Sequence, residues 1–472
     1  MPSRRRLPLP AALAALAALA SWSPVAAAAP RPNVLLLFSD DLRAELGCYG
    51  TVGIKTPHID ALARRSVRFD RAYVQFPLCN PSRSSLLTGR YPTATGVMGN
   101  TEFLGSRHPE WDTLPMYFRK HGYVTLRTGK IFHGGYDDTD AWVEGGEVRP
   151  LGNADRQGST QDPKRSDSII ILEGDGENHG DYKSASNAID YLRRHGKGDR
   201  PFFLACGFSK PHSPPTAPRK LFEQYDVDRI PLPADFAPRP TVPAGFPARS
   251  VPARNGDLFI GRDASEKEAR EMKRAYWAAV SFVDAQVGRV LAALDELGLR
   301  ENTVIVFWGD HGYHLGEKGK WSKHNSLWEV GLRVPYMISA PGVSANGQAC
   351  ARVVECMSMY PTLVDLCGLP AVAGQNGVSI TRLLRAPSAA WDQPAISVCY
   401  VQRILGRSVR TDRWHYADWD EGRGGAMLID TLKDPGERTN LAEDPTYAPV
   451  LAEMRQHLRR LPALTSPPAR KS

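Results

Sequence analysis

Acidic side chains follow two short apolar stretches of the chain, and their positions indicate a metal site. Asp40 and Asp41 follow the apolar residues 34–38 after a single serine, and Asp310 follows the apolar residues 304–308 after a single glycine. Each acid alone could simply cap a helix or lie in a loop. Two adjacent carboxylates after a buried strand are unfavourable unless a cation neutralises them, and oxygen ligands suit calcium or magnesium. Three acids at strand ends therefore favour a divalent metal site.

His311 follows Asp310, and two roles are open for it. Its imidazole could contact the metal through a ring nitrogen, or it could lie beside the metal and carry a proton or donate to an anion. An isolated histidine is more often structural. Here the neighbouring Asp310 and Gly312 favour a position at or near the metal.

Four further basic side chains could bind an anion or transfer protons, namely Lys130, His133, His212 and Lys323. A lysine is usually a solvated surface charge, and a single histidine usually makes structural hydrogen bonds. The residues by themselves therefore favour the structural interpretation for each of the four.

Residues 79–83 form the pattern cysteine-x-proline-serine-arginine, which begins at Cys79 and ends at Arg83. Proline and serine are common at helix starts, so Cys79 could be an inert thiol at the beginning of a helix. The same cysteine could also be a reactive residue.

Strands that alternate with helices are expected to hold these side chains in place. Residues 34–38, 202–205 and 304–308 are predicted buried parallel strands, and each is followed by polar residues. Residues 273–297 are a predicted helix that Gly298 ends. The expected fold is therefore α/β, with a large, mostly parallel sheet between helices. Ligands bind beyond the carboxyl ends of such strands, where the polar clusters fall.

The rest of the chain divides into a long excursion and a smaller C-terminal part. Residues 211–252 contain eleven prolines, too many for a helix or central strand, and could either shape a pocket or merely connect. Strands are predicted at 395–401 and 407–416, and a helix at about 447–461. We therefore expect a catalytic domain at 30–374 and an antiparallel α+β subdomain at 375–472.

The first 29 residues have the features of a cleaved secretory signal: three arginines, an Ala/Leu stretch and small residues before the cleavage site. The arginines fit either a twin-arginine signal or an ordinary positive start. Cleavage would leave 56 basic and 51 acidic residues, a net charge of +5. Basic residues are not interleaved with aromatics, so nucleic acid is not an expected partner, and no membrane span is expected. The expected location is periplasmic or secreted.

An exported protein can form disulfides, and six cysteines accompany Cys79. Cys350 and Cys356 would make the favoured short loop. Cys206 lies in an apolar run and is expected to be a buried free thiol.

Six segments resemble the sulfatase family of the alkaline phosphatase-like superfamily, and their order covers nearly the whole mature chain. They are residues 33–43, 79–90, 129–133, 210–212, 308–312 and 434–442. The closest branch looks like the iduronate-2-sulfatase-like enzymes, which act on sulfated glycosaminoglycans. That branch shares the two-residue spacing between Lys130 and His133 and a histidine at 311, where many relatives have asparagine. Ser39 replaces a common valine, and no loss of metal is expected from that change.

The resemblance implies that a formylglycine-generating or sulfatase-maturating enzyme oxidises Cys79 to formylglycine. Asp40, Asp41, Asp310 and His311 would then hold one calcium ion, together with an oxygen of the modified Cys79.

The resemblance also implies roles for the basic residues. Arg83 and the metal would position the hydrated aldehyde, one hydroxyl of which attacks the sulfate ester. Lys130 and Lys323 would share the developing charge. His212 would protonate the leaving oxygen, and His133 would deprotonate the remaining hydroxyl so that sulfate leaves. A helix that begins near residue 82 would direct its N–H groups at the anion.

The leading hypothesis is a sulfuric ester hydrolase acting on a sulfated carbohydrate, such as a 2-sulfated uronic acid. A phosphodiesterase or phosphonate monoester hydrolase is one alternative, because that related group uses the same cysteine pattern. An inactive protein that binds sulfated glycans, with Cys79 still a thiol, is another.

Overall fold

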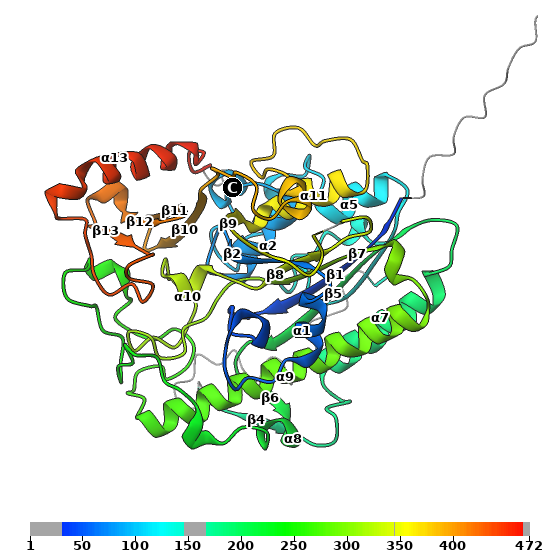
Figure 1. The fold of residues 1–472 in the computed structure, drawn as a ribbon, viewed down its shortest axis with the longest axis horizontal. Coiled ribbons are helices and arrows are strands. Elements are labelled where there is room, and N and C mark those ends of the chain that lie inside the picture. Colours follow the sequence, from blue (N-terminus) through cyan, green and yellow to red (C-terminus); the bar gives the residue numbers. More distant parts are fainter. Residues whose placement is uncertain (1–30, 146–166, 344, 466–472) are drawn as a thin grey trace, which may run out of the picture. The chain divides into compact units, whose positions relative to one another are not determined.

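The computed structural model describes residues 31–145, 167–343 and 345–465, so the predicted signal at 1–29 lies outside the described residues. From Pro32 onward the described chain forms one compact unit. Its centre is a seven-stranded sheet with the order β3-β5-β1-β7-β8-β2-β9 (Figure 1). The strands are β1 (Asn33–Asp40), β2 (Val67–Tyr73), β3 (Val124–Gly129), β5 (Phe202–Pro211), β7 (Thr303–Gly309), β8 (Tyr336–Ser339) and β9 (Ala349–Glu355).

The sheet is mostly parallel, as the alternation of strands and helices predicts. β1 pairs in parallel with β5 and β7, and β3 pairs in parallel with β5. β8 is antiparallel to both of its neighbours, β7 and β2. The three predicted strands are confirmed as parts of β1, β5 and β7, so their carboxyl ends lie at one edge of the sheet.

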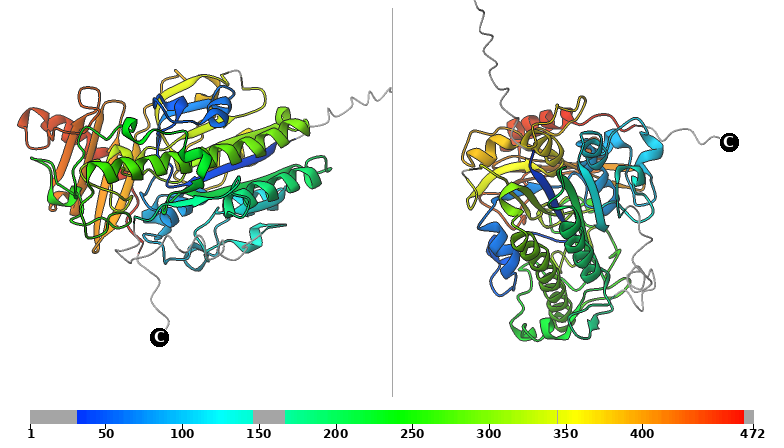
Figure 2. Two further views of the ribbon diagram at one scale, coloured as in Figure 1. Left: turned by 90° about the horizontal axis from the view of Figure 1, so that it is seen from below. Right: turned by 90° about the vertical axis from the view of Figure 1, so that its right-hand side faces the viewer.

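Helices cover both faces of the sheet because both faces of its central strands are apolar. Along β1, Leu36 and Phe38 belong to one core and Leu35 and Leu37 to the other. The first core includes side chains of α2 (Cys79–Thr88), α5 (Leu114–Lys120) and α11 (Met359–Leu366). The second includes side chains of α1 (Pro57–Ala63), α7 (Gly180–His195) and α9 (Glu266–Glu296). Figure 2 shows α7 and α9 running side by side.

α9 begins seven residues earlier than its apolar pattern predicts. Ser265 is its N-cap, and its hydroxyl accepts a hydrogen bond from the backbone N–H of Glu268 while the Glu268 carboxylate accepts from the backbone of Ser265. Gly298, at φ +69°, follows the helix end as predicted. α9 has the length and hydropathy of a membrane-crossing helix, but 78% of its most apolar window is buried here. It is the core helix of this fold.

Short elements complete the main part of the chain. β4 (Ile170–Leu172) pairs in parallel with β6 (Thr216–Pro218), which belongs to the proline-rich excursion. Most of that excursion is irregular, as its prolines predict. The short helices are α3 (Pro92–Thr95), α4 (Leu104–Arg107), α8 (Arg219–Phe222), α10 (Glu329–Leu332) and α12 (Thr381–Arg385).

The C-terminal sheet is antiparallel, with the order β10-β11-β12-β13, and α13 (Ala448–His457) packs against it. The strands are β10 (Ala395–Val401), β11 (Ile404–Arg410), β12 (Trp414–Trp419) and β13 (Ala426–Asp430). The single strand predicted at 407–416 is therefore wrong. A turn at 411–413 divides it, with the Thr411 N–H donating to the Trp414 carbonyl at 2.9 Å.

The expected disulfide is also wrong. All seven cysteines are free thiols, and Cys350 and Cys356 are both buried. The Cys350 Sγ donates to the Pro387 carbonyl at 3.2 Å. The buried free thiol expected at Cys206 is confirmed.

A buried ion network joins the C-terminal sheet to α10. The Arg410 guanidinium lies 2.8 Å from a Glu329 carboxylate oxygen and 2.7 Å from one of Glu437. His415 donates to the same Glu437 oxygen at 2.7 Å, and the Glu329 N–H donates to the other at 2.8 Å. Arg410 therefore pairs with two carboxylates from separate segments, of which Glu437 is buried and Glu329 partly buried.

We expect Arg410→Met to lower the free energy of unfolding by about 3–5 kcal/mol, because it leaves the buried Glu437 carboxylate without its arginine partner. Urea denaturation measures this change. Arg423→Met is the matched control, since Arg423 and its partner Asp420 are exposed; it should change stability little. Equal effects of the two substitutions would show that the network does not stabilise the fold.

Candidate active site

The chain turns sharply where β1 ends, and this turn presents two carboxylates. The pairing of β1 with β5 shifts register between Ser39 and Asp40. Asp41 has a φ of 62°, a left-handed conformation that aspartate tolerates better than most residues. Its N–H donates to Asp310 Oδ1 at 2.9 Å, which ties the end of β1 to the end of β7.

Four predicted ligands come together at this edge of the sheet. The ligand atoms of Asp40, Cys79, Asp310 and His311 all lie within 4.8 Å of one another, and all four residues are buried. A second set within the same limit joins Asp40, Cys79 and Asp41 with His212. The residues that the sequence places on distant segments therefore form one cluster.

Cys79 is the first residue of α2, which begins three residues earlier than the helix start predicted near residue 82. The Cys79 Sγ lies 3.3 Å from His311 Nε2. Burial, followed by the charge of Asp40, raises the pKa of the Cys79 thiol well above its usual value. An unmodified thiol would stay protonated here and be a poor nucleophile.

His311 is oriented by its own loop. Its Nδ1 lies 3.0 Å from the Gly312 carbonyl, which can only accept, so Nδ1 carries a proton. Its Nε2 then faces the cluster, 3.3 Å from Asp41 Oδ1. Of the two roles open for His311, this orientation fits a metal ligand directly.

Three cations face the three carboxylates of the cluster. Arg83 is fully buried, and its Nε donates to Asp310 Oδ2 at 2.9 Å. Lys323 Nζ donates to both oxygens of Asp41 at 2.8 Å, and Lys130 Nζ donates to Asp40 Oδ2. The cations therefore match the carboxylates in number.

The cations also keep Asp40 ionised despite its burial. Burial opposes the charged form, but Lys130, His212 and Arg83 together outweigh it and hold the pKa of Asp40 well below its usual value. For Asp310, burial and then the charge of Asp40 raise the pKa. Asp40 and Asp310 therefore repel each other, and a bound cation would relieve that repulsion.

The donor set fits a divalent metal. Asp40 Oδ1 is buried and accepts no hydrogen bond from the described residues; Arg83 Nη2 lies 3.6 Å from it. Carboxylate oxygens are the ligands that calcium and magnesium prefer. Because the three fixed cations already match the three carboxylates, a divalent ion would make the cluster positive and favour an anionic substrate.

His133 lies in the loop that follows β3, three residues after Lys130. Burial, followed by the charge of Lys130, lowers the pKa of His133 to about 3. Its Nδ1 is buried and has no hydrogen-bond partner among the described residues. The imidazole is therefore neutral near pH 7 and able to accept a proton.

A chain of hydrogen bonds that the sequence does not reveal holds His212 in position. Its Nδ1 donates to the Ser213 carbonyl at 2.8 Å, and the Ser213 hydroxyl donates to Asp257 Oδ1. Asp257 Oδ2 accepts from the Tyr313 hydroxyl at 2.7 Å. Asp257 thus joins the loop of His212 to the loop of His311. It lies in an irregular segment 45 residues beyond His212 in the chain, so no motif or periodicity signals its role.

Comparison with known proteins identifies the family. A family model described as Sulfatase matches residues 32–369, and one described as N-sulphoglucosamine sulphohydrolase, C-terminal, matches residues 316–463. Iduronate 2-sulfatase of Mus musculus is 33% identical over 386 residues, which cover 72% of this chain and 69% of that protein. This chain belongs to the sulfatase family, and it is a sulfuric ester hydrolase of sulfated carbohydrates.

Solved structures confirm the predicted alkaline phosphatase-like fold. A 2-O GAG sulfatase matches with a TM-score of 0.70 at 26% identity, covering 91% of this chain and 91% of that chain. The phosphonate monoester hydrolase of Agrobacterium radiobacter matches with a TM-score of 0.73 at 23% identity, covering 91% and 95%. Because the phosphonate monoester hydrolase is only 23% identical, its similarity concerns the fold alone. Membership of the sulfatase family implies a formylglycine and a metal. Cys79 stands at the position of the formylglycine, and the acids and histidine around it form a suitable donor set for the metal.

We expect the imidazole of His133 to show no titration between pH 5 and 8 in histidine NMR spectra. Lys130→Met should raise its pKa from about 3, because a positive neighbour that opposes protonation is removed, while burial keeps it below its usual value. Lys120→Met, at an exposed lysine paired with Asp112, is the control and should leave the pKa unchanged. A His133 that titrates near its usual value in the unaltered protein would show that burial and Lys130 do not lower its pKa.

Proposed function

We propose that this sulfatase removes the 2-O-sulfate from a uronic acid of a sulfated glycan, using formylglycine made from Cys79 and one calcium ion. The observation that carries the proposal is the buried cluster of Asp40, Cys79, Asp310 and His311 within 4.8 Å, faced by three cations. The resemblance of residues 79–90 to the sulfatase segment supports the modification. The oxygen-rich donor set supports calcium.

The chemistry divides between the bound groups and the chain. Formylglycine would supply a hydrated aldehyde as the nucleophile. Calcium, held by Asp40, Asp41, Asp310 and His311, would supply positive charge beside residue 79. The chain provides orientation, proton transfer and the exclusion of water around them.

Lys130 and Lys323 bind the sulfate group and share the charge that develops on its oxygens. Both ammonium groups stay protonated: burial opposes the charge, but Asp40 and Asp41, respectively, raise the pKa of Lys130 and of Lys323. Fixed cations in a buried site stabilise such charge without rearranging. Arg83 donates to the carbonyls of Lys130 at 2.6 Å and Ile131 at 2.9 Å, so it also holds the Lys130 loop in place.

His212 and His133 carry the protons. His212 donates through Nδ1 to the Ser213 carbonyl, so its Nε2 faces the cluster and protonates the leaving oxygen. His133 is neutral and accepts the proton whose removal releases sulfate. One histidine thus acts as an acid and the other as a base.

The substrate proposal is supported by relatives whose names state their own substrates. The names of the Mus musculus iduronate 2-sulfatase and of the solved 2-O GAG sulfatase both specify a sulfate at position 2. We also propose that residues 1–29 direct export to the periplasm or the exterior, and that a maturating enzyme first converts Cys79. The charge and apolar pattern of those residues supports export.

Mass spectrometry of the tryptic peptide of residues 72–83, combined with ester assays, tests this function. We expect 4-nitrophenyl sulfate and 2-O-sulfated uronic acid disaccharides to be hydrolysed in proportion to the converted fraction of Cys79. Calcium chelation and Cys79→Ala should each remove at least about 99% of the activity, because each removes the nucleophile or its neighbouring charge.

Three results would contradict the proposal in different ways. Full activity with an unmodified thiol would overturn the mechanism. Preference for phosphonate or phosphate esters over sulfate esters would indicate the phosphonate monoester hydrolase alternative. Glycan binding without hydrolysis after full conversion would indicate the inactive binding protein.

Asp257 should affect the rate of hydrolysis only for esters whose leaving group needs a proton. We expect Asp257→Asn to lower kcat on a carbohydrate sulfate by roughly tenfold, part of the effect of a general acid, with KM little changed. Activity on 4-nitrophenyl sulfate should stay within about twofold, because its phenolate leaves without protonation. The pair of assays measures the positioning of His212.

Asp263→Asn is the matched control, since Asp263 lies in the same irregular segment before α9 but is exposed and pairs with Arg239. Combining Asp257→Asn with His212→Gln should add little to His212→Gln alone. Equal losses on both esters would instead assign Asp257 a purely structural role.

A further inference from the structure

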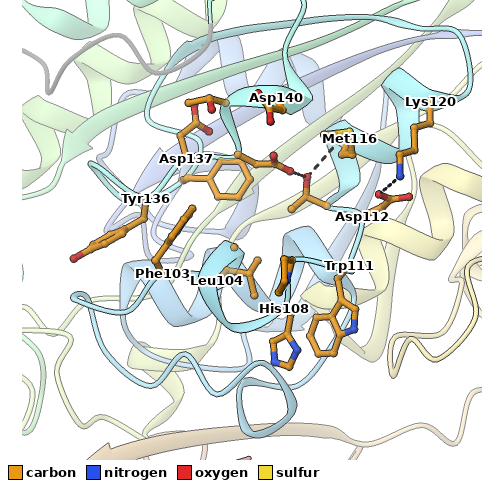
Figure 3. Close-up of a pocket in the computed structure, with 16 residues that line it drawn as sticks. Phe103, Leu104, His108, Trp111, Asp112, Met116, Lys120, Tyr136, Asp137 and Asp140 are labelled. Atoms are coloured by element: carbon orange, nitrogen blue, oxygen red, sulfur yellow. Dashed lines mark hydrogen bonds and ion pairs between the residues drawn. The ribbon is translucent and has the colours of Figure 1, made fainter. Parts of the chain in front are cut away.

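A second hollow lies beside the loop that carries the catalytic candidates Lys130 and His133, and its walls are rich in aromatic rings (Figure 3). We call it the aromatic pocket; residues 103–120 and 132–140 form it. Its volume of about 360 Å³ lies within the usual range of about 300–1,000 Å³ for small-ligand sites. It is large enough for a sugar ring.

The aromatic pocket is linked to the loops of the catalytic cluster at two places. Phe132 lines the pocket, and the next residue, His133, is influenced by the charges of the cluster. The side-chain amide of Asn80, the residue after Cys79, donates to the carbonyls of Gly99 at 2.9 Å and Glu102 at 2.7 Å. These bonds tie the segment before Phe103 to the start of α2. The pocket therefore adjoins the two loops that carry Cys79 and His133.

Aromatic rings frame both ends of the pocket. The rings of Phe103 and Tyr136 stack with centroids 6.0 Å apart and an angle of 28° between their planes, and Phe103 is 38% exposed. Figure 3 shows this pair at one end and the rings of His108 and Trp111 at the other. Exposed aromatic rings suit the C–H face of a pyranose, because the negative ring face attracts polarised C–H groups.

The pocket is lined by more acidic than basic side chains, whereas the fixed charges of the catalytic cluster balance. Asp112 is paired with Lys120 at 2.6 Å, whereas Asp138 and Asp140 have no ion-pair partner within the described ranges. Asp138 accepts from the Thr113 hydroxyl at one oxygen. Burial, and then the charges of Asp140 and Asp112, raise the pKa of Asp138. Carboxylates accept hydrogen bonds from sugar hydroxyls but repel sulfate and carboxylate groups.

We propose that the aromatic pocket binds the sugar ring next to the sulfated one and takes an uncharged pyranose, such as N-acetylhexosamine, in preference to a sulfated ring. Phe103 and Tyr136 contact the ring face, and Asp138 and Asp140 select against negative charge. The inference rests on the proposed function, because it places the sulfated uronic ring at residue 79. The enzyme would then act on glycan segments whose neighbouring residue has no sulfate.

Binding alone tests the pocket without relying on catalysis. In saturation-transfer NMR with the full chain, methyl N-acetylglucosaminide should receive saturation and its 6-sulfate should receive much less. Phe103→Ala should abolish the transfer, and Phe103→Tyr should restore it. Trp414→Ala, at an aromatic residue of the C-terminal sheet, is the control and should leave it unchanged. No transfer, or equal transfer to both sugars, would overturn the proposal.

Kinetics tests whether the pocket selects substrates. We expect Phe103→Ala to lower kcat/KM on a 2-O-sulfated disaccharide with an unsulfated hexosamine by about tenfold, as loss of one well-packed aromatic contact does. Activity on 4-nitrophenyl sulfate should stay unchanged. Asp138→Asn combined with Asp140→Asn should reduce the preference for the unsulfated over the 6-sulfated disaccharide by about tenfold.

The outcomes separate this inference from the proposed function. If the unaltered protein hydrolyses no sulfate ester, the proposed function fails, and the binding experiment still decides the pocket's preference. If sulfate esters are hydrolysed but the pocket variants change the aryl and disaccharide activities equally, the pocket is not a subsite.

Discussion

Three buried carboxylates at the ends of two adjacent strands need opposite charge, and the rest of the site is arranged around that need. Asp40, Asp41 and Asp310 are almost completely buried. Buried carboxylates stay ionised only if cations and hydrogen-bond donors surround them. Arg83, Lys130 and Lys323 come from three other segments to meet this requirement. Because these fixed charges balance, the site can bind a divalent ion together with an anionic ester.

The strand ends were predictable because their signal is local. Residues 34–38 and 304–308 are buried on both faces of the sheet and are therefore continuously apolar, and the acids follow immediately. Parallel strands bring their carboxyl ends to one edge, so the meeting of Asp40 with Asp310 follows from topology. Sequence alone left Lys130, His133, His212 and Lys323 ambiguous, and only resemblance to sulfatases assigned them roles.

Other features depend on contacts that no local pattern records. Asp257 is held in position by hydrogen bonds that it accepts from Ser213 and Tyr313, which lie 44 and 56 residues away in the sequence. The turn at 411–413 divides what looks like one strand, because its three residues, Thr-Asp-Arg, include no glycine or proline to mark it. The aromatic pocket joins residues from α4, α5 and the loop after β3, and their spacing matches neither a helix nor a strand. These features are determined by burial and by contacts between residues that are far apart in the sequence.

The proposed chemistry requires a divalent cation bound by the strand-end carboxylates next to residue 79. Anomalous diffraction from crystals of the matured protein grown with calcium measures this most directly. We expect one strong peak with oxygens of Asp40, Asp41 and Asp310 at about 2.3–2.6 Å and residue 79 in contact with the ion. A peak remote from these aspartates, or an ion shielded from residue 79, would contradict the proposed chemistry.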